Sequence, residues 1–169
     1  MKKKISILGS TGSIGETTLK IIYKKNKIFQ LNTLIANSNY KKICKQIIKN
    51  KPKNFVINDK KTFLQIKKKF KGKKINLYSD FKYLPKSSTV NDITVVGIPG
   101  LAGLEPTIKF VQYSKKLLLA NKESIICGWL LLNKLSKKYK TEIIPIDSEH
   151  FSINKLSKDY KDKDIEKIY

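Results

Sequence analysis

The chain has 169 residues, 40% of them hydrophobic, which is enough for one compact core with a short piece of a second domain but too little for two full domains. The formal net charge of +23 would by itself suggest nucleic acid or an anionic membrane as a partner. All 36 basic residues are lysines, however, and the chain contains no arginine. Arginine is the residue that proteins prefer for contacts with bases and phosphates. Because the lysines are spread along the whole chain, we interpret them as solvated helix faces and expect no nucleic-acid partner.

Neither the cysteines nor the hydropathy pattern indicates an extracellular or membrane protein. Cys44 and Cys127 have no partner at metal-ligand spacing, so we expect both to pack as small hydrophobic residues. No apolar stretch approaches the roughly 20 residues that span a bilayer. A strand-like run begins at Ile5, which leaves no room for a targeting peptide before the fold. We therefore expect a cytoplasmic protein without a membrane partner.

Short apolar runs alternate with longer segments of helical periodicity, which is typical of βαβ units. The alternation predicts an α/β fold, a doubly wound, mostly parallel, Rossmann-like sheet with helices on both faces. Most of the expected strands are continuous apolar runs, as in sheets that are buried on both sides. In chain order we expect strand 4–8, helix 14–25, strand 31–36, helix 40–49, strand 54–57, helix 60–70, strands 75–78 and 93–96, helix 104–113, strand 117–120, helix 122–138 and strand 142–145.

The segment 9–15, Gly-Ser-Thr-Gly-Ser-Ile-Gly, lies between the first expected strand and the first expected helix. Glycines at such a turn let the backbone approach a pyrophosphate, and the N–H groups at the helix start supply an anion site. A structural turn with helix capping is the alternative. The strand before the glycines, the helix after them and the second strand beyond favour dinucleotide binding.

The second expected strand ends in Ala36, Asn37, Ser38 and Asn39, where an NAD-binding unit usually carries an acidic residue for the ribose hydroxyls. A neutral turn beside several lysines tolerates a 2′-phosphate, so the sequence favours NADPH over NADH. An ordinary polar turn is the alternative interpretation.

Two further polar segments follow expected strands. In the first segment, Asn121 could simply cap the next helix, with Lys122 and Glu123 as a surface pair. In the alternative interpretation, Lys122 attracts an anionic substrate, and Asn121 and Glu123 position the nicotinamide. In the other, Asp147 and Glu149 could hold a hard divalent cation such as Mg²⁺ or Mn²⁺ on one side of an extended segment. A solvated turn or a cap is the alternative there. His150, next in the chain, could be a third ligand or a structural residue.

After His150 charged residues dominate, and we expect the alternation of helices and strands to end there. The natural division is a dinucleotide-binding domain at 1–146 and the beginning of a second, incomplete domain at 147–169. The four consecutive apolar residues at 129–132 predict apolar surface that would face such a second domain.

Four segments in this order and spacing resemble 1-deoxy-D-xylulose 5-phosphate reductoisomerase, and the resemblance runs from residue 4 to about 150. It implies an NADPH-dependent and divalent-metal-dependent enzyme, using Mg²⁺, Mn²⁺ or Co²⁺, that rearranges and then reduces a small phosphorylated sugar. The product would be 2-C-methyl-D-erythritol 4-phosphate of the non-mevalonate isoprenoid route, and the parent enzyme would be a homodimer. The segments are Gly-Ser-Thr-Gly-Ser-Ile-Gly at 9–15, Gly-Leu-Glu-Pro-Thr at 103–107, Leu-Ala-Asn-Lys-Glu-Ser at 119–124 and Pro-Ile-Asp-Ser-Glu-His at 145–150.

The same resemblance implies a role for each matching residue. In this assignment Lys122, Ser148 and Glu149 contact the substrate, and Asp147 and Glu149 are metal ligands. The cofactor pyrophosphate is contacted by Thr11, Gly12, Ser13 and Ile14. The adenosine ribose and its phosphate are contacted by Asn37, Ser38 and Asn39. The remainder of the cofactor is contacted by Asn121 and Glu123.

The chain departs from the family pattern in three places. The segment 151–155 reads Phe-Ser-Ile-Asn-Lys where many members have Asn-Ala-Ile-Phe-Gln, and the segment 97–103 is longer than the usual loop. The chain also stops where the family continues into a substrate-phosphate loop, a further metal carboxylate and a helical C-terminal domain. We therefore expect this chain alone to be inactive.

Two hypotheses from other classes compete with the enzyme. A stand-alone nucleotide-binding module would use the glycine loop without redox chemistry, but it would have no need of the Asp-Ser-Glu run at 147–149. A lysine-rich nucleic-acid binder is disfavoured because arginines and interleaved exposed aromatic residues are lacking.

Overall fold

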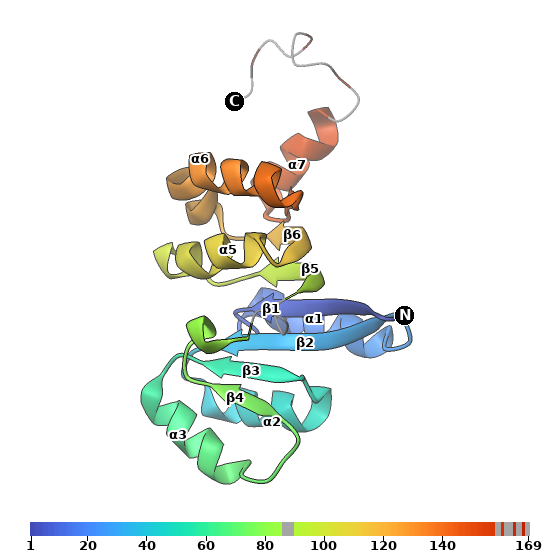
Figure 1. The fold of residues 1–169 in the computed structure, drawn as a ribbon. Helices are drawn as coiled ribbons and strands as arrows, with labels where there is room; N and C mark the ends of the chain where they lie inside the picture. The colour runs from blue at the N-terminus through green and yellow to red at the C-terminus, as the bar shows by residue number, and fades with distance from the viewer. Residues whose placement is uncertain (86–89, 158–159, 161–163, 165–166, 168–169) are drawn as a thin grey trace.

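The structure, a computed structural model, describes all residues except 86–89, 158–159, 161–163, 165–166 and 168–169 (Figure 1). Its centre is a seven-stranded sheet in which every pair of neighbouring strands is parallel, in the order β4-β3-β2-β1-β5-β6-β7. The doubly wound parallel fold expected from the sequence is therefore confirmed. The strands are β1 (Lys3–Leu8), β2 (Phe29–Ala36), β3 (Asn54–Ile57), β4 (Asn76–Tyr78), β5 (Asn91–Val96), β6 (Ser114–Leu119) and β7 (Glu142–Pro145).

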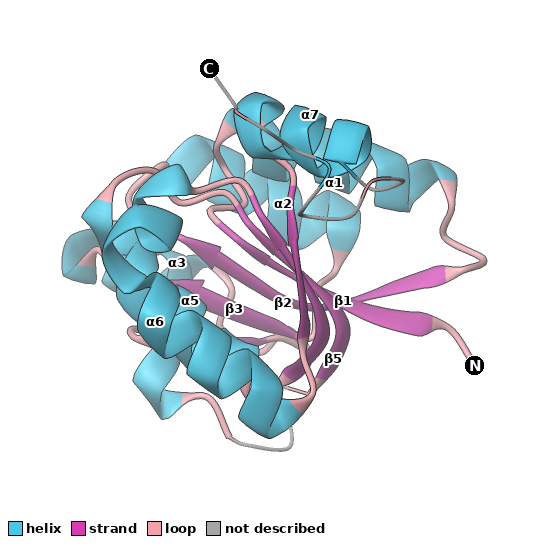
Figure 2. Cartoon of the chain, turned by 90° about the horizontal axis from the view of Figure 1, so that it is seen from above, coloured by secondary structure: helices cyan, strands magenta, loops and turns pink. Residues whose placement is uncertain are grey.

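The helices cover both faces of the sheet. Helices α1, α2 and α3 pack over one hydrophobic cluster, and α5, α6 and the 3₁₀ turn η1 pack over the other. Figure 2 shows α1 and α2 on the opposite side of the sheet from α5 and α6. The helices are α1 (Ser13–Lys24), α2 (Tyr40–Asn50), α3 (Lys60–Lys69), α5 (Leu104–Val111), α6 (Lys122–Tyr139) and α7 (Ser148–Ser157), with 3₁₀ turns η1 (Phe81–Tyr83) and η2 (Leu101–Gly103).

The two faces of the sheet divide the apolar side chains by strand alternation. Ile7, Leu34 and Phe55 point into the cluster under α1, α2 and α3, while Leu8 and Ile35, each one position further along, point into the other. All five are buried, as expected for strands covered on both faces. This packing fixes the register of the strands, because a one-residue slip would exchange the two faces.

The C-terminal part of the fold differs from the sequence-based expectation. The expected end of the helix and strand alternation after His150 is wrong, because α7 continues to Ser157. This helix contains no buried residue, so it carries no apolar periodicity that a sequence could reveal. The expectation that both cysteines are packed holds for Cys44 but not for Cys127, which is exposed on α6.

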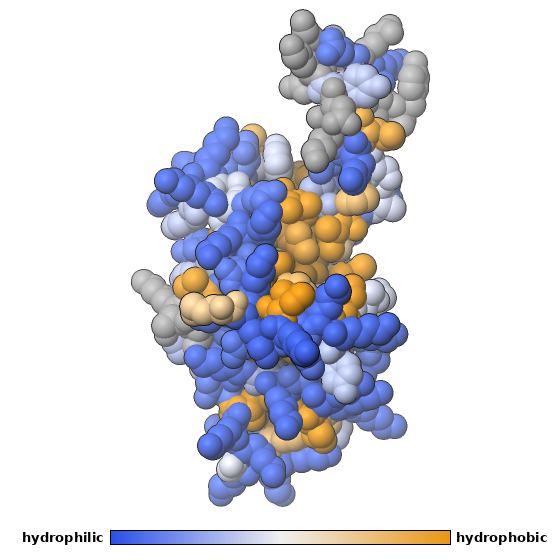
Figure 3. Space-filling model, turned by 90° about the vertical axis from the view of Figure 1, so that its right-hand side faces the viewer, coloured by the Kyte–Doolittle hydropathy of each residue, from blue (hydrophilic) through white to orange (hydrophobic). Residues whose placement is uncertain are grey.

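The outer surface of α6 confirms the expected apolar exposure in part. Ile126, Trp129, Leu130 and Leu131 are exposed, whereas Leu132 turns inward and is buried. Figure 3 shows an apolar, orange area in the upper half of one face of the molecule, surrounded by a largely hydrophilic surface. Among the described residues, no helix is both long and apolar enough to cross a membrane.

Candidate functional site

The glycine loop joins the end of β1 to the start of α1 and is held tightly against the sheet. The backbone N–H groups of Gly9 and Ser10 both donate to the carbonyl of Ile35 at 2.9 Å, on the neighbouring strand β2. Gly9 has a φ of +85°, and a β-carbon there would lie 2.7 Å from the carbonyl oxygen of Gly97. Only glycine satisfies both constraints, so the loop brings bare backbone to the carboxyl edge of the sheet.

The start of α1 is open to an anion. Gly12 is the N-cap residue and supplies no side-chain hydrogen bond to the first turn. The N-terminal N–H groups of a helix have no partner within the helix, so they remain available to an oxygen of a bound phosphate. By contrast, α2, α3 and α6 are each capped by a side chain, those of Asn39, Asp59 and Asn121.

A cavity of about 350 Å³ lies beside this loop, where β1, β2 and β5 end. Thr11, Gly12 and Asn37 are the predicted cofactor residues that line it. Of the other predicted residues, Ser13 and Ile14 are exposed at the start of α1, and Ser38 and Asn39 are exposed in the turn after β2. The structure therefore brings the glycine loop and the turn after β2 to one cavity.

The turn after β2 carries no carboxylate that could accept hydrogen bonds from ribose hydroxyls. Asn37 is exposed, and Asn39 caps α2 by accepting a hydrogen bond from the Lys42 backbone N–H at 3.1 Å. The preference for NADPH over NADH that the sequence suggests therefore stays a prediction.

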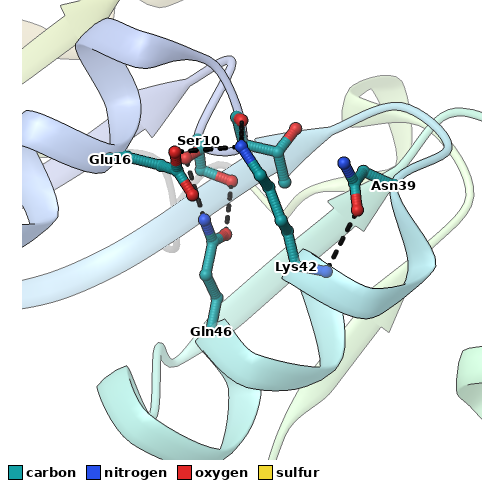
Figure 4. A network of polar contacts seen from close by, with 6 residues as sticks. Ser10, Glu16, Asn39, Lys42 and Gln46 are labelled. Atoms are coloured by element: carbon teal, nitrogen blue, oxygen red, sulfur yellow. Dashed lines mark hydrogen bonds and ion pairs between the residues drawn. The ribbon is translucent and has the colours of Figure 1, made fainter.

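Helix α2 supports the glycine loop through contacts that the sequence analysis missed (Figure 4). The buried amide of Gln46 donates to the carbonyl of Ser10 and accepts from its hydroxyl, both at 2.8 Å. The Lys42 ammonium donates to the carbonyl of Thr11 at 3.0 Å and to the Glu16 carboxylate at 2.9 Å. The only sequence signal is that Lys42 and Gln46 are spaced i, i+4 and so share one face of the helix.

A larger hollow of about 460 Å³ lies between α1 and α2. Its lining includes Tyr23 and five lysines, but no glycine and no backbone from the glycine loop. The smaller cavity presents the loop and helix N–H groups by which a pyrophosphate is recognised, and the larger hollow presents none of them.

Asn121 links the second polar segment to the wall of the smaller cavity. Its side-chain oxygen accepts from the Ser124 backbone N–H at 2.7 Å, which confirms the helix cap. Its amide nitrogen donates to the carbonyls of Ile98 and Gly100, the second at 2.9 Å. Because Ile98 lines the cavity, Asn121 fixes the cavity wall from behind, and its own predicted contact with the cofactor stays a prediction.

The carboxylate segment lies at the start of α7. The expected extended segment is wrong, because Ser148 begins a helix and Asp147 caps it, accepting from the His150 backbone N–H at 3.0 Å. The same oxygen, Oδ1, lies 2.7 Å from Nδ1 of His150. Burial is the largest influence on Asp147 and raises its pKa, but the hydrogen bonds and charge of His150 together bring the pKa below its usual value.

Lys122 and Glu149, predicted to act together on the substrate, lie near each other. The Lys122 ammonium is 3.8 Å from Oε1 of Glu149, and the Ser148 hydroxyl donates to Oε2 at 2.8 Å. The hydroxyl of Ser148, followed by the Lys122 charge, lowers the pKa of the Glu149 carboxyl. Both charged side chains are more than half exposed, so the cluster remains open to a ligand.

The fit of this segment to a divalent cation is partial. Oδ2 of Asp147 is buried and has no hydrogen-bond partner, which suits an oxygen that binds a cation. However, within the described part of the chain no three side chains of His, Cys, Asp or Glu form a group that could hold a metal. Asp147 and Glu149 therefore supply at most part of a coordination sphere.

The chain is similar to known proteins. A family model described as 1-deoxy-D-xylulose 5-phosphate reductoisomerase matches residues 5–128. Proteins of that name from Pelagibacter ubique and Clostridium novyi are 45% and 41% identical to this chain, and each alignment covers 99% of this chain and 44% of the relative. The chain thus spans less than half the length of these relatives.

Solved structures agree with this comparison. The reductoisomerase from Zymomonas mobilis in complex with NADPH superposes with a TM-score of 0.81 at 30% identity, over 89% of this chain and 40% of that chain. A DOX-P reductoisomerase in complex with NADPH, fosmidomycin and magnesium gives a TM-score of 0.80 at 32% identity, over 88% of this chain and 37% of that chain.

Proposed function

The chain belongs to the 1-deoxy-D-xylulose 5-phosphate reductoisomerase family. From this we propose that it forms the NADPH-binding part of an enzyme that converts 1-deoxy-D-xylulose 5-phosphate to 2-C-methyl-D-erythritol 4-phosphate in the non-mevalonate isoprenoid route. The observation that carries the proposal is the glycine loop, whose bare backbone and uncapped helix start face a cavity at the carboxyl edge of the sheet.

NADPH is the proposed cofactor, because a neutral turn replaces the acidic residue that an NAD-binding unit carries after its second strand. Thr11, Gly12, Ser13 and Ile14 would hold the pyrophosphate. The turn of Asn37, Ser38 and Asn39 would take the ribose and its phosphate, and Asn121 and Glu123 would lie toward the rest of the cofactor. The relative from Zymomonas mobilis, crystallised with NADPH, supports this choice.

The carboxylate segment would belong to a metal and substrate site. Asp147 and Glu149 would be ligands of Mg²⁺, Mn²⁺ or Co²⁺, and the magnesium in a related structure supports the first of these. The metal would supply Lewis-acid polarisation of substrate oxygens. Lys122, with its exposed ammonium, would attract the anionic sugar phosphate, and the Ser148 hydroxyl and Glu149 would orient it.

We further propose that residues 1–146 form the NADPH-binding domain and that 147–169 begin the metal-binding domain. The enzyme would be a homodimer in the cytoplasm. Residues beyond those described here would complete the metal site, because Asp147 and Glu149 lack a third ligand in the described part of the chain. The chain alone is therefore expected to bind cofactor without turnover.

A binding measurement tests the cofactor assignment. The chain is titrated with NADPH and with NADH while the fluorescence of the reduced nicotinamide is followed, and NADPH is expected to bind more tightly. Gly12→Leu should abolish both, because a side chain at this position would block the approach of the backbone to the pyrophosphate. Equal affinities for the two cofactors would overturn the choice of NADPH, and absence of both would overturn the site.

A chimaera tests the reaction. Residues 1–169 are joined to the remaining part of the Pelagibacter ubique relative, and oxidation of NADPH is measured with 1-deoxy-D-xylulose 5-phosphate and Mg²⁺. We expect turnover in the chimaera and a sharp loss with Asp147→Asn, because the Lewis acid would be lost or misplaced. Full turnover by the Asn variant would remove Asp147 from the metal site. An inactive chimaera that still binds NADPH would favour a nucleotide-binding module without redox chemistry.

A metal titration of the 169-residue chain complements the chimaera. With two carboxylates and no substrate, we expect no binding of Mg²⁺ tighter than about millimolar by calorimetry, as at the weak end of known oxygen-ligand sites. Tight binding would show that the described residues already complete the site.

A further inference from the structure

The turn after β2 presents no positive charge to a cofactor phosphate. Its side chains, those of Asn37, Ser38 and Asn39, are all neutral. The 2′-phosphate that distinguishes NADPH from NADH is a phosphate monoester with nearly two negative charges at neutral pH, and a nearby cation usually accommodates it. If the chain selects NADPH, its positive charge therefore has to come from another element.

Lys42, in the first turn of α2, supplies such a charge. Its ammonium lies 3.0 Å from the carbonyl oxygen of Thr11, a residue that lines the dinucleotide cavity. The Lys42 backbone is tied to the turn after β2 through the cap that Asn39 forms. The Lys42 side chain thus runs from the turn that would hold the adenosine ribose to the glycine loop, and its ammonium lies at the loop end beside Glu16 (Figure 4). Lys42 and Glu16 also line the hollow between α1 and α2, so the ammonium meets the dinucleotide cavity at its Thr11 side.

The ammonium is accessible and only partly engaged. Its side chain is 40% exposed, and that of its ion-pair partner Glu16 is 41% exposed. Of its three N–H donors, the bonds to Thr11 and Glu16 use two. An incoming phosphate oxygen can therefore reach the ammonium without opening the core.

Lys42 is not the only residue of α2 that holds the loop. Gln46, one turn further along α2, is buried and makes two hydrogen bonds to Ser10. These two bonds anchor the loop to α2 independently of Lys42. Lys42 is a half-exposed cation beside a loop that Gln46 also anchors, so its ammonium is available to a charged ligand in addition to its bond to Thr11.

Building on the proposed function, we propose that Lys42 recognises the 2′-phosphate of NADPH and is the residue that sets the preference over NADH. Glu16 is its counter-ion when no cofactor is bound. Because the Glu16 carboxylate has the same sign as the phosphate, it opposes binding, and the two residues therefore influence NADPH affinity in opposite directions. NADH lacks the phosphate, so its affinity depends little on either residue.

The test compares dissociation constants for NADPH and NADH across matched variants of the 169-residue chain. Lys42→Met should weaken NADPH about tenfold or more, as expected for the loss of one hydrogen bond between charged groups, and should change NADH less than about twofold. Lys42→Arg should restore much of the preference. Glu16→Gln should tighten NADPH by a few-fold. Lys45→Met removes the same charge from the same helix and should leave both constants unchanged.

A second probe isolates the phosphate from the rest of the cofactor. Adenosine 2′,5′-bisphosphate and adenosine 5′-monophosphate are titrated against the wild type and Lys42→Met. We expect the wild type to favour the bisphosphate and the variant to lose most of that preference. Circular dichroism and thermal unfolding of each variant establish that the fold is retained.

The outcomes separate the inference from the function on which it rests. A wild type that binds neither dinucleotide overturns the proposed function, and the inference with it. A wild type that prefers NADPH, with a Lys42→Met variant that keeps the preference or loses both cofactors equally, overturns only the role of Lys42. In the second case Lys42 supports the loop and does not read the phosphate.

Discussion

The glycine loop and the carboxylate segment lie at the same edge of the parallel sheet, but their polar groups are satisfied in different ways. In the loop, the backbone of Ser10 and Thr11 is bonded to α2, and the neighbouring strand β2 accepts two more N–H groups. In the carboxylate segment, Oδ2 of Asp147 is buried without a partner, and α7 buries none of its residues. The backbone of the loop is therefore held in place by its neighbours, whereas the carboxylate segment keeps a buried oxygen without a hydrogen-bond partner among the described residues.

The largest expected effect comes from the loop glycines. Gly9→Ala would combine a left-handed φ of +85° with a β-carbon 2.7 Å from a backbone oxygen of Gly97, so we expect a loss of about 3 kcal/mol in the free energy of unfolding and no NADPH binding. Gly72→Ala is the matched control, because φ is +80° there but nothing lies within 4 Å. It should cost about 1 kcal/mol. Urea unfolding measures both, and similar losses would mean that the loop tolerates rearrangement.

A smaller effect is expected from the support that α2 gives the loop. Gln46→Ala would leave the buried hydroxyl and carbonyl of Ser10 without their partners, at a cost of about 2 kcal/mol in unfolding free energy. NADPH and NADH should both weaken, and by the same factor, since the backbone of the loop serves both. Gln65→Ala, at an exposed position of α3, should change unfolding by less than about 0.5 kcal/mol. An unchanged affinity in Gln46→Ala would show that the loop needs no preorganisation.

The second region is tested through the outer surface of α6. Ile126 and Leu130 are 73% and 88% exposed, so replacing both with Gln should change the unfolding free energy by less than about 1 kcal/mol. We expect the wild-type chain to self-associate through this surface in light scattering and the double variant to do so less. Leu132→Gln, at a buried position of the same helix, should instead lower the unfolding free energy by about 2 kcal/mol. A monodisperse wild-type monomer would contradict the proposal that this surface needs a cover.

The smallest effect is expected where the two halves of the sheet meet. Asp92, on β5, accepts from the Lys4 backbone N–H at 2.9 Å and pairs with the Lys115 ammonium at 2.8 Å. The Lys115 hydrogen bond, followed by that of Lys4, lowers the Asp92 pKa. A lowered pKa stabilises the fold above the unfolded value of about 3.9, and this stabilisation is lost as pH falls through the folded pKa.

Asp92→Asn should therefore cost about 0.5 kcal/mol at pH 7, and the difference from the wild type should vanish as the pH falls below about 4. Unfolding measured at several pH values checks this, and raised salt should reduce the difference at pH 7. A difference that does not change with pH would place the contribution of Asp92 in packing instead of charge.

The sequence predicted the sheet because its strands are continuous apolar runs, but it misplaced the strand starts. Strand β5 begins at Asn91 and β6 at Ser114, earlier than the apolar pattern suggested. Both residues are polar and buried: Asn91 accepts from the hydroxyl of Ser6, and Ser114 shares a hydrogen bond with Thr94. A buried polar residue with a distant partner is indistinguishable from a loop residue when only the local pattern is available.

In the candidate site, as in the sheet, the sequence predicted the local features and missed the contacts between distant residues. The glycine loop and the Asn121 cap are local features and were identified from neighbouring residues. The contacts of Lys42 and Gln46 with the loop join residues that are more than thirty positions apart, so spacing could not reveal them. Helix α7 was missed because it has no buried apolar face, and its start is marked only by the cap at Asp147.

The strand order has a consequence for how the chain folds. Strand β1 pairs with both β2 and β5: Lys3 lies beside Phe29, and Ile5 lies beside Ile93. The chain segment that must close to pair β1 with β5 is therefore roughly three times as long as the segment that must close to pair β1 with β2. By loop-closure entropy alone the longer loop costs about 1 kcal/mol more. We expect β1 to β4 to assemble first and β5 to join later. Because Gly97, at the end of β5, closes the space around Gly9, the nucleotide cavity takes its final shape only when β5 has docked, so a folding intermediate that lacks β5 should not bind cofactor.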